Sequence, residues 1–235
     1  MKILVNGASF SRGPISWPYC LPGISDKTGK NIINLACAGA GNSYIHDTTI
    51  RLLDKMKVDL VLIMWTAPQR IDFQISNLDI IETVNSSKYQ SSLNDWPEKI
   101  IDSLNDQDLI EKNWVFGHSM LMNPDNDDLK KIFNGIYMQM GDVELLNQFL
   151  IKVITLQNTL KQLNIPYVFS FDQDYIDQIR MSNLIDWDNC ISDQTISDIA
   201  SNLNDYQEDG YHPGEIANQE WAKIVVDHIM KNKLL

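Results

Sequence analysis

The chain has 235 residues, 44% of them hydrophobic and 21% charged, and a formal net charge of −12. This length and composition favour a single globular α/β domain, residues 1–235, whose core needs neither disulfides nor metals. The negative charge disfavours nucleic acids and membrane surfaces as partners, because both are themselves negatively charged.

Five short apolar runs predict buried parallel strands. The strongest, residues 60–65, is apolar throughout, as expected of a strand that is covered on both faces. Residues 2–6 and 32–36 end at turns that contain glycine, and residues 167–171 begin after a proline. The fifth strand is only weakly marked and is expected within 184–192.

Apolar residues at helical spacing predict helices between these strands. The helix after the second strand has one apolar face, made by Ile45, Thr49, Leu52, Leu53 and Met56. Another helix covers 143–163, with Asp142 as its cap. The last helix begins near Pro213 and buries Ala217, Trp221, Ile224 and Val225. This alternation predicts a three-layer α/β/α sandwich around a mostly parallel sheet.

Residues 71–141 interrupt the alternation of strands and helices. They are polar and carry Trp96 and Trp114. We interpret the stretch as one long insertion that packs over or beside the sheet within the same domain. Its acidic residues are interpreted as a solvated face: Asp72, Asp79 and Glu82.

Reactive residues occur in the loops after the first two strands, where α/β proteins bind their ligands. The first loop reads Gly7-Ala8-Ser9-Phe10-Ser11, and its glycine lets the chain turn sharply and bring Ser9 to the strand end. The second reads Ala38-Gly39-Ala40-Gly41-Asn42-Ser43, and its small residues leave backbone N–H groups open to an oxyanion.

The segment Asp209-Gly210-Tyr211-His212-Pro213 stands before the last helix. An aspartate three residues before a histidine can reach one ring nitrogen across a tight turn. This contact fixes the tautomer and leaves the other nitrogen free to take a proton from a serine. The pattern predicts a triad in which Ser9 is the nucleophile, His212 the base and Asp209 its partner.

These segments resemble the sequence blocks of the SGNH (GDSL-like) hydrolase superfamily. That family has a serine after the first strand, an oxyanion-hole glycine after the second and an Asp-x-x-His pair near its end, which match Ser9, Gly39 and Asp209/His212. The sequence of these blocks is closer still to a subset with a Gly-Cys-Ser-Phe-Thr-like first block, which is common in phages and bacteria. The resemblance implies a flavodoxin-like strand order and an oxyanion hole made by the Ser9 and Gly39 N–H groups.

The third block of the family, Gly-x-Asn, has no counterpart here, because the chain reads Trp65-Thr66-Ala67-Pro68-Gln69-Arg70. The missing oxyanion donor would be replaced by Asn42, Thr66, Gln69 or the Trp65 indole, and the sequence leaves this choice open. Loss of one such donor lowers the rate by about 10²–10³ without abolishing catalysis. Thr66 and Arg70 are candidates for substrate binding. Arg70 could hold a substrate carboxylate, although a surface salt bridge is an equal alternative.

The resemblance implies a serine esterase that hydrolyses short acyl esters, above all acetyl esters of carbohydrates, through an acyl-enzyme on Ser9. No cofactor is expected, and no spacing of His, Cys, Asp or Glu predicts a metal site. Three alternatives stay open: an acyltransferase on the same fold, an SGNH scaffold without catalysis that has a binding or structural role, and a flavodoxin-like binder of a nucleotide or flavin.

The start of the chain has an apolar run of three residues, Ile3-Leu4-Val5, too short for a secretory signal peptide. The cysteines, Cys20, Cys37 and Cys190, are odd in number and widely spaced, which is typical of free thiols in a reducing compartment. We therefore expect a cytoplasmic protein.

Overall fold

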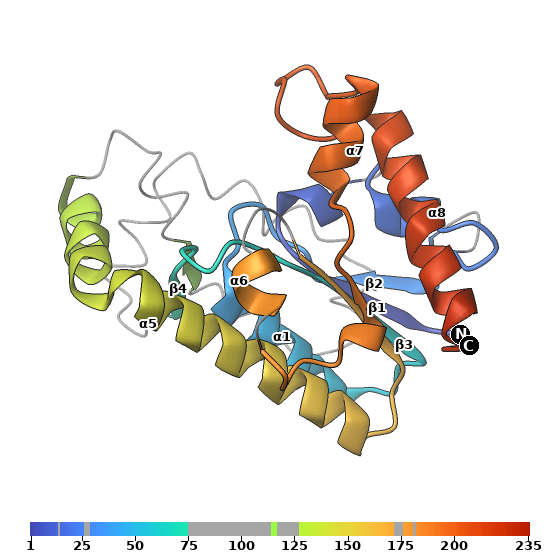
Figure 1. Ribbon diagram of the computed structural model, residues 1–235, viewed down its shortest axis with the longest axis horizontal. Helices are drawn as coiled ribbons and strands as arrows, with labels where there is room; N and C mark the ends of the chain where they lie inside the picture. Colours follow the sequence, from blue (N-terminus) through green and yellow to red (C-terminus); the bar gives the residue numbers. More distant parts are fainter. Residues whose placement is uncertain (14, 26–28, 75–113, 117–126, 172–175, 181) are drawn as a thin grey trace.

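The computed structural model describes residues 1–13, 15–25, 29–74, 114–116, 127–171, 176–180 and 182–235 (Figure 1). The predicted residues Asp79, Glu82 and Trp96 lie outside these ranges. Within the described ranges, no helix is both long and apolar enough to cross a bilayer.

A five-stranded sheet forms the centre of the molecule, with its strands in the order β2-β1-β3-β6-β7 and every neighbouring pair parallel. The strands are β1 (Ile3–Asn6), β2 (Ile32–Asn34), β3 (Leu60–Trp65), β6 (Tyr167–Phe171) and β7 (Cys190–Ile191). The predicted flavodoxin-like order is confirmed, and the fifth strand lies in the expected window. In this order the chain reverses its direction of travel between β1 and β3, and ligands of such folds bind outside the strand ends at that point.

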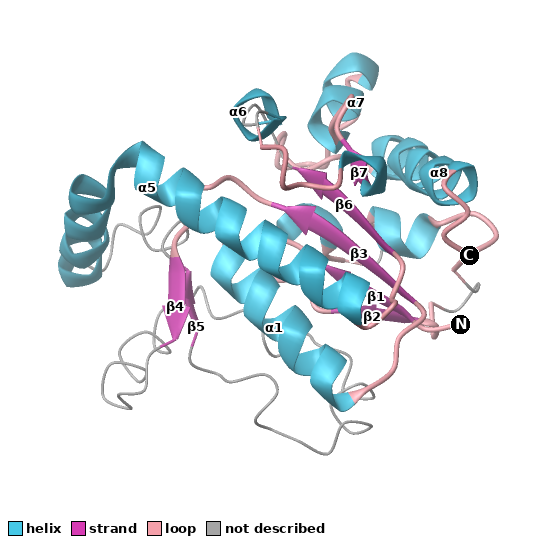
Figure 2. Cartoon of the chain, turned by 60° about the horizontal axis from the view of Figure 1, so that its bottom comes forward, coloured by secondary structure: helices cyan, strands magenta, loops and turns pink. Residues whose placement is uncertain are grey.

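Helices cover both faces of the sheet, which confirms the predicted sandwich (Figures 1 and 2). One face is covered by α1 (Asn42–Lys55) and α5 (Asp127–Gln162), and the other by α7 (Ile196–Leu203) and α8 (Glu215–Lys231). Shorter helices lie in the connections: η1 (Ser9–Ser11), η2 (Trp17–Cys20), α6 (Ile176–Arg180) and η3 (Trp187–Asn189).

The side chains of β3 explain why that strand is apolar throughout. Val61, Ile63 and Trp65 belong to the core under α1 and α5, and the alternate residues belong to the core under α7 and α8. The Trp65 ring packs edge-on against Phe149 and Phe169, with centroids 5.9 and 5.6 Å away. A central strand with two buried faces needs apolar residues at every position.

The polar end of β1 is buried as well. Asn6 is fully buried, and its side-chain N–H groups lie 2.9–3.0 Å from acceptors in α1, namely the Ile45 carbonyl and the hydroxyls of Thr48 and Thr49. Its own carbonyl oxygen accepts from the Gly7 N–H at 2.9 Å. A buried amide that is fully hydrogen-bonded joins the strand end to the helix at a fixed height.

The stretch 71–141 contains more regular structure than its sequence indicates. It contributes a two-stranded antiparallel ribbon of β4 (Asp72–Gln74) and β5 (Trp114–Phe116) and the first part of α5. Helix α5 is interrupted at Gly141, whose φ is 65°, so its second part starts where Asp142 was predicted to cap a helix. Pro213 lies one residue before Gly214, the N-cap of α8.

Candidate functional site

Ser9 lies at the carboxyl end of β1, at the start of the short helix η1. The turn that places it there requires a glycine at position 7, because a Cβ on Gly7 would lie 2.7 Å from the Ser11 hydroxyl and 3.1 Å from the Met64 carbonyl oxygen. Backbone hydrogen bonds from Ser11 to Ala8 and from Arg12 to Ser9 close the turn. The nucleophile predicted from the sequence therefore stands at the switch point of the sheet.

Asp209 and His212 lie in the loop between α7 and α8. The loop is closed below them by a bridge between Tyr206 and Pro213 and by a hydrogen bond of 2.8 Å from the Gln207 N–H to the His212 carbonyl. Asp209 Oδ2 lies 2.5 Å from His212 Nδ1, as predicted. Its other oxygen accepts the backbone N–H groups of Tyr211 and His212, each at 2.9 Å.

These hydrogen bonds keep Asp209 ionised. The N–H of His212, then that of Tyr211, and then the imidazole lower the pKa of the Asp209 carboxyl to about 2. With Nδ1 engaged by the carboxylate, Nε2 is the nitrogen that remains to take a proton. Both side chains reach the surface, with exposed fractions of 47% for Asp209 and 30% for His212, so the pair is accessible to water and substrate.

Phe10 connects the first loop with the last one. Its ring packs edge-on against the His212 imidazole, with centroids 5.6 Å apart, and contacts Tyr211 at the same distance. Ser9, the adjacent residue, is thereby brought to the neighbourhood of the base across some 200 positions of sequence. No hydrogen bond between the Ser9 hydroxyl and His212 is formed in the described part of the chain. Such catalytic contacts often tighten only when a substrate binds.

The second loop supplies Gly39, which has a φ of 78° and so adopts a conformation that favours glycine. The Cys37 N–H donates to the Gly7 carbonyl at 3.2 Å, which ties this loop to the Ser9 loop. Among the described residues, no acceptor occupies the backbone N–H of Ser9 or of Gly39. These two N–H groups are therefore not engaged by any described residue, and their role in an oxyanion hole stays a prediction.

The side chain of Asn42 is engaged within the fold. It donates to the carbonyls of Thr66 and Ala67 at 3.1 and 3.0 Å and accepts the Thr66 N–H at 3.1 Å. Both side-chain N–H bonds are thus in use, and one would have to be released before Asn42 could bind an oxyanion. In the described structure this residue holds the loop after β3 against the start of α1.

The loop after β3 carries polar atoms without a partner. Thr66 is 3% exposed, and its hydroxyl makes no hydrogen bond within the described residues. The same holds for the side-chain oxygen Oε1 of Gln69. The Trp65 indole N–H is also unpartnered, but its ring lies in the core with Phe149. Thr66 and Gln69 therefore keep polar side-chain atoms near the carboxyl end of β3 that no described residue engages.

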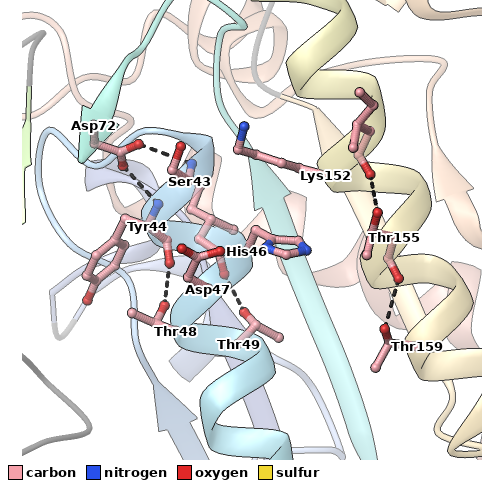
Figure 3. A network of polar contacts seen from close by, with 12 residues as sticks. Ser43, Tyr44, His46, Asp47, Thr48, Thr49, Asp72, Lys152, Thr155 and Thr159 are labelled. Carbon is pink, nitrogen blue, oxygen red and sulfur yellow. Dashed lines mark hydrogen bonds and ion pairs between the residues drawn. The ribbon is translucent and has the colours of Figure 1, made fainter. Parts of the chain in front are cut away.

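Asp72 is a buried residue that sequence reasoning misjudged. It was interpreted as part of a solvated face, but its side chain is 4% exposed and lies at the N-terminus of α1 (Figure 3). Its carboxylate accepts the N–H groups of Gly41, Ser43 and Tyr44 at 2.8–3.1 Å. Burial raises the pKa of Asp72 to about 6, although these hydrogen bonds act in the opposite direction. The stretch 71–141 thereby supplies the cap of α1, whose N-cap residue is Gly41.

Arg70 lies against the same helix start. A Cβ on Gly41 would come within 2.3 Å of the Arg70 carbonyl oxygen, so this close approach requires glycine. The guanidinium is half-buried and forms no ion pair within the described part of the chain. Its charge acts on the Tyr137 hydroxyl, which donates to the backbone carbonyl of Gln69. The structure thus places both predicted substrate-binding residues, Thr66 and Arg70, in one loop, which approaches Gly41 closely.

No family model and no curated protein matches this sequence. No group of three or more His, Cys, Asp or Glu side chains suited to a metal ion occurs within the described ranges.

Several solved structures resemble the chain. Esterase EstA from Pseudoalteromonas sp. is 14% identical, with a TM-score of 0.45 over 99% of this chain and 96% of that one. Protein YXIM from Bacillus subtilis is 13% identical with a TM-score of 0.48, and this chain spans 99% of its own length but only 56% of that protein. A proposed acylhydrolase from Bacteroides fragilis is 14% identical, with a TM-score of 0.32 over 100% and 88% of the two chains. With TM-scores below 0.5, none of these resemblances decides the function of this chain.

Proposed function

We propose that this protein is a serine esterase of the SGNH type, which hydrolyses short acyl esters through an acyl-enzyme on Ser9. The observation that carries the proposal is the contact between Phe10 and His212, because it brings the serine loop to an imidazole already held by an ionised aspartate. The Ser9 and Gly39 N–H groups, which lack partners in the described structure, are the proposed oxyanion hole.

The reaction would proceed in two balanced steps. His212 Nε2 takes the Ser9 proton while Oγ bonds to the ester carbonyl carbon, and the protonated imidazole then gives that proton to the departing alcohol as its C–O bond breaks. Water enters next and loses a proton to His212, and its oxygen bonds to the acyl carbon. The bond to Ser9 Oγ breaks, the serine recovers the proton, and the carboxylic acid leaves.

The most direct test of this proposal is covalent labelling with diisopropyl fluorophosphate. Activated serines displace fluoride from this reagent, whereas ordinary serines do not react. We expect one equivalent of diisopropylphosphoryl adduct, found on the peptide that contains Ser9, and no adduct in Ser9→Ala or His212→Ala. Ser201→Ala, which changes an exposed serine of α7, should label like the wild type. Equal labelling of the His212→Ala variant would contradict the proposed base.

We further propose that Thr66 and Arg70 bind the polar, alcohol side of the substrate, and that acetylated sugars which carry a carboxylate fit this loop. The Arg70 guanidinium forms no ion pair with a described residue, and no described residue engages the buried Thr66 hydroxyl. Together they complement a carboxylate and a sugar hydroxyl. Arg70→Met should raise KM for O-acetyl galacturonate by about 10–100-fold, the range expected for a charge-assisted hydrogen bond.

The methyl ester of the same acetylated sugar is the matched neutral substrate, and its KM should change little in Arg70→Met. Arg180→Met serves as the control variant, because Arg180 lies on α6 and is paired with Asp177 and Asp193. An equal rise in KM for both substrates in Arg70→Met would show that this arginine does not bind the carboxylate.

A further inference from the structure

Asn218 connects the loop of the serine with the loop of the histidine. It lies in the first turns of α8, is 2% exposed, and belongs to neither predicted sequence block. Its side-chain carbonyl accepts the Trp17 backbone N–H at 2.9 Å. Its side-chain N–H groups donate to the carbonyls of Pro213 and Gly214 at 3.0 and 2.8 Å.

Trp17 carries this connection on to the turn that holds Ser9. Its indole N–H donates to the Ser11 hydroxyl at 3.1 Å, and both side chains are almost fully buried. Ser11 is the last residue of η1, which begins with Ser9. The Ser11 carbonyl also accepts from Asn34 of β2 at 2.7 Å, so the turn is anchored on the sheet as well.

On the other side, Asn218 grips the two residues that follow His212. Pro213 and Gly214 are buried, whereas Asp209 and His212 reach the surface. Asp205 adds a second anchor, because its carbonyl accepts the Gly214 N–H at 2.8 Å and its carboxylate the Ala217 N–H at 2.6 Å. The height of the imidazole above the sheet is therefore set by the backbone that Asn218 holds.

We propose that Asn218 is a positioning residue that fixes the distance between Ser9 and His212, and this inference rests on the proposed esterase function. The planar amide accepts a hydrogen bond from one loop and donates hydrogen bonds to the other. If either loop moved, the amide could keep its hydrogen bonds to that loop only by breaking those to the other. Displacement of reacting groups by about 1 Å can slow a reaction by about 10²-fold. Loss of Asn218 should slow the chemical step and leave substrate binding largely intact.

The experiment uses two variants, one that removes the whole connection and one that removes only half of it. Asn218→Ala removes both halves, and Asn218→Asp keeps the acceptor for Trp17 while it loses the donors to Pro213 and Gly214. Each should lower kcat for p-nitrophenyl acetate about 10–100-fold, with KM changed less than about 3-fold. The maximal rate at which diisopropyl fluorophosphate labels Ser9 should fall by the same factor. Asn232→Ala is the control, because this residue bonds Asp188 from the far end of the same helix.

All assays are run well below the lowest melting temperature, so that a loss of folded protein does not imitate a loss of rate. Folded variants with the wild-type kcat and labelling rate would overturn the proposal. A second measurement does not depend on activity: the chain has four histidines, and the ring ¹H–¹⁵N signals of His212 can be assigned with His212→Ala. Asn218→Ala should shift these signals and leave those of His46 unchanged.

The two readouts separate the two proposals. If the wild-type protein neither hydrolyses esters nor reacts with the fluorophosphate, the esterase function fails, and the NMR comparison alone decides the role of Asn218. Unchanged His212 signals in Asn218→Ala would then overturn the positioning role. If the wild type is active, and Asn218→Ala and Asn218→Asp have the wild-type kcat and labelling rate, the esterase function stands and the Asn218 inference fails.

Discussion

Ser9→Ala and His212→Ala are each expected to lower kcat/KM for p-nitrophenyl acetate and butyrate by about 10³-fold or more. In the proposed mechanism, removal of the nucleophile or of the base abolishes the acyl-enzyme route and leaves only binding and the oxyanion hole. Asp209→Asn should cost less than either, because the imidazole remains and only its orientation and charge stabilisation are lost. The measurement is the initial rate of p-nitrophenol release, with each variant compared at equal concentration of folded protein.

His228→Ala, a change on the outer part of α8, is the matched histidine control and should retain the wild-type rate. The pattern across the series is decisive. Wild-type activity in all the variants would mean that the reaction occurs elsewhere and that the triad is wrong. A wild type as inert as its variants on every ester tested would favour a scaffold that binds ligands without catalysis.

Asp72→Ala is expected to lower the free energy of unfolding by about 2–4 kcal/mol, since three backbone N–H groups at the start of α1, two of them buried, would lose their acceptor. The same change should lower esterase activity, because Gly39 stands directly before the helix end that Asp72 holds. Chemical denaturation measures the first effect and p-nitrophenyl acetate hydrolysis the second.

Asp198→Ala separates these two effects. Asp198 forms the capping box of α7 with Thr195, away from the oxyanion loop. Its loss should cost about 1 kcal/mol of stability and no activity. Equal losses of activity in Asp72→Ala and Asp198→Ala would contradict a specific link between Asp72 and the loop that contains Gly39.

The raised pKa of Asp72 adds a pH signature to this prediction. The folded pKa is about 6, and an unfolded aspartate has a value near 3.9. Between these values the folded state binds more protons than the unfolded state, so this group makes the free energy of unfolding fall as the pH rises from about 4 to about 6. Asp72→Asn lacks this contribution. The difference in stability between wild type and Asp72→Asn should therefore change within that window and be constant above it.

Much of the fold could be predicted because its strands leave local signals. A strand buried on both faces, such as residues 60–65, is apolar at every position, and the Asp209-x-x-His212 contact depends on a turn that the sequence itself contains. Asp72 could not be recognised, because its partners are backbone N–H groups that become its neighbours only after folding. The one available hint was the start of α1, where the N-cap residue is Gly41, which has no side chain to cap its own helix. Asn218 left no signal, since an asparagine on the buried side of a helix resembles any other polar position.

The hydrogen bond between Trp17 and Asn218 joins residues 201 positions apart, and it has a consequence for how the protein becomes active. Contacts of such long sequence separation form late, because the chain between them must first be ordered. During refolding, the sheet and α1 can assemble while the imidazole loop is still undocked. Secondary structure should therefore return before esterase activity, and the recovery of catalysis should report the docking of α8 onto the serine loop.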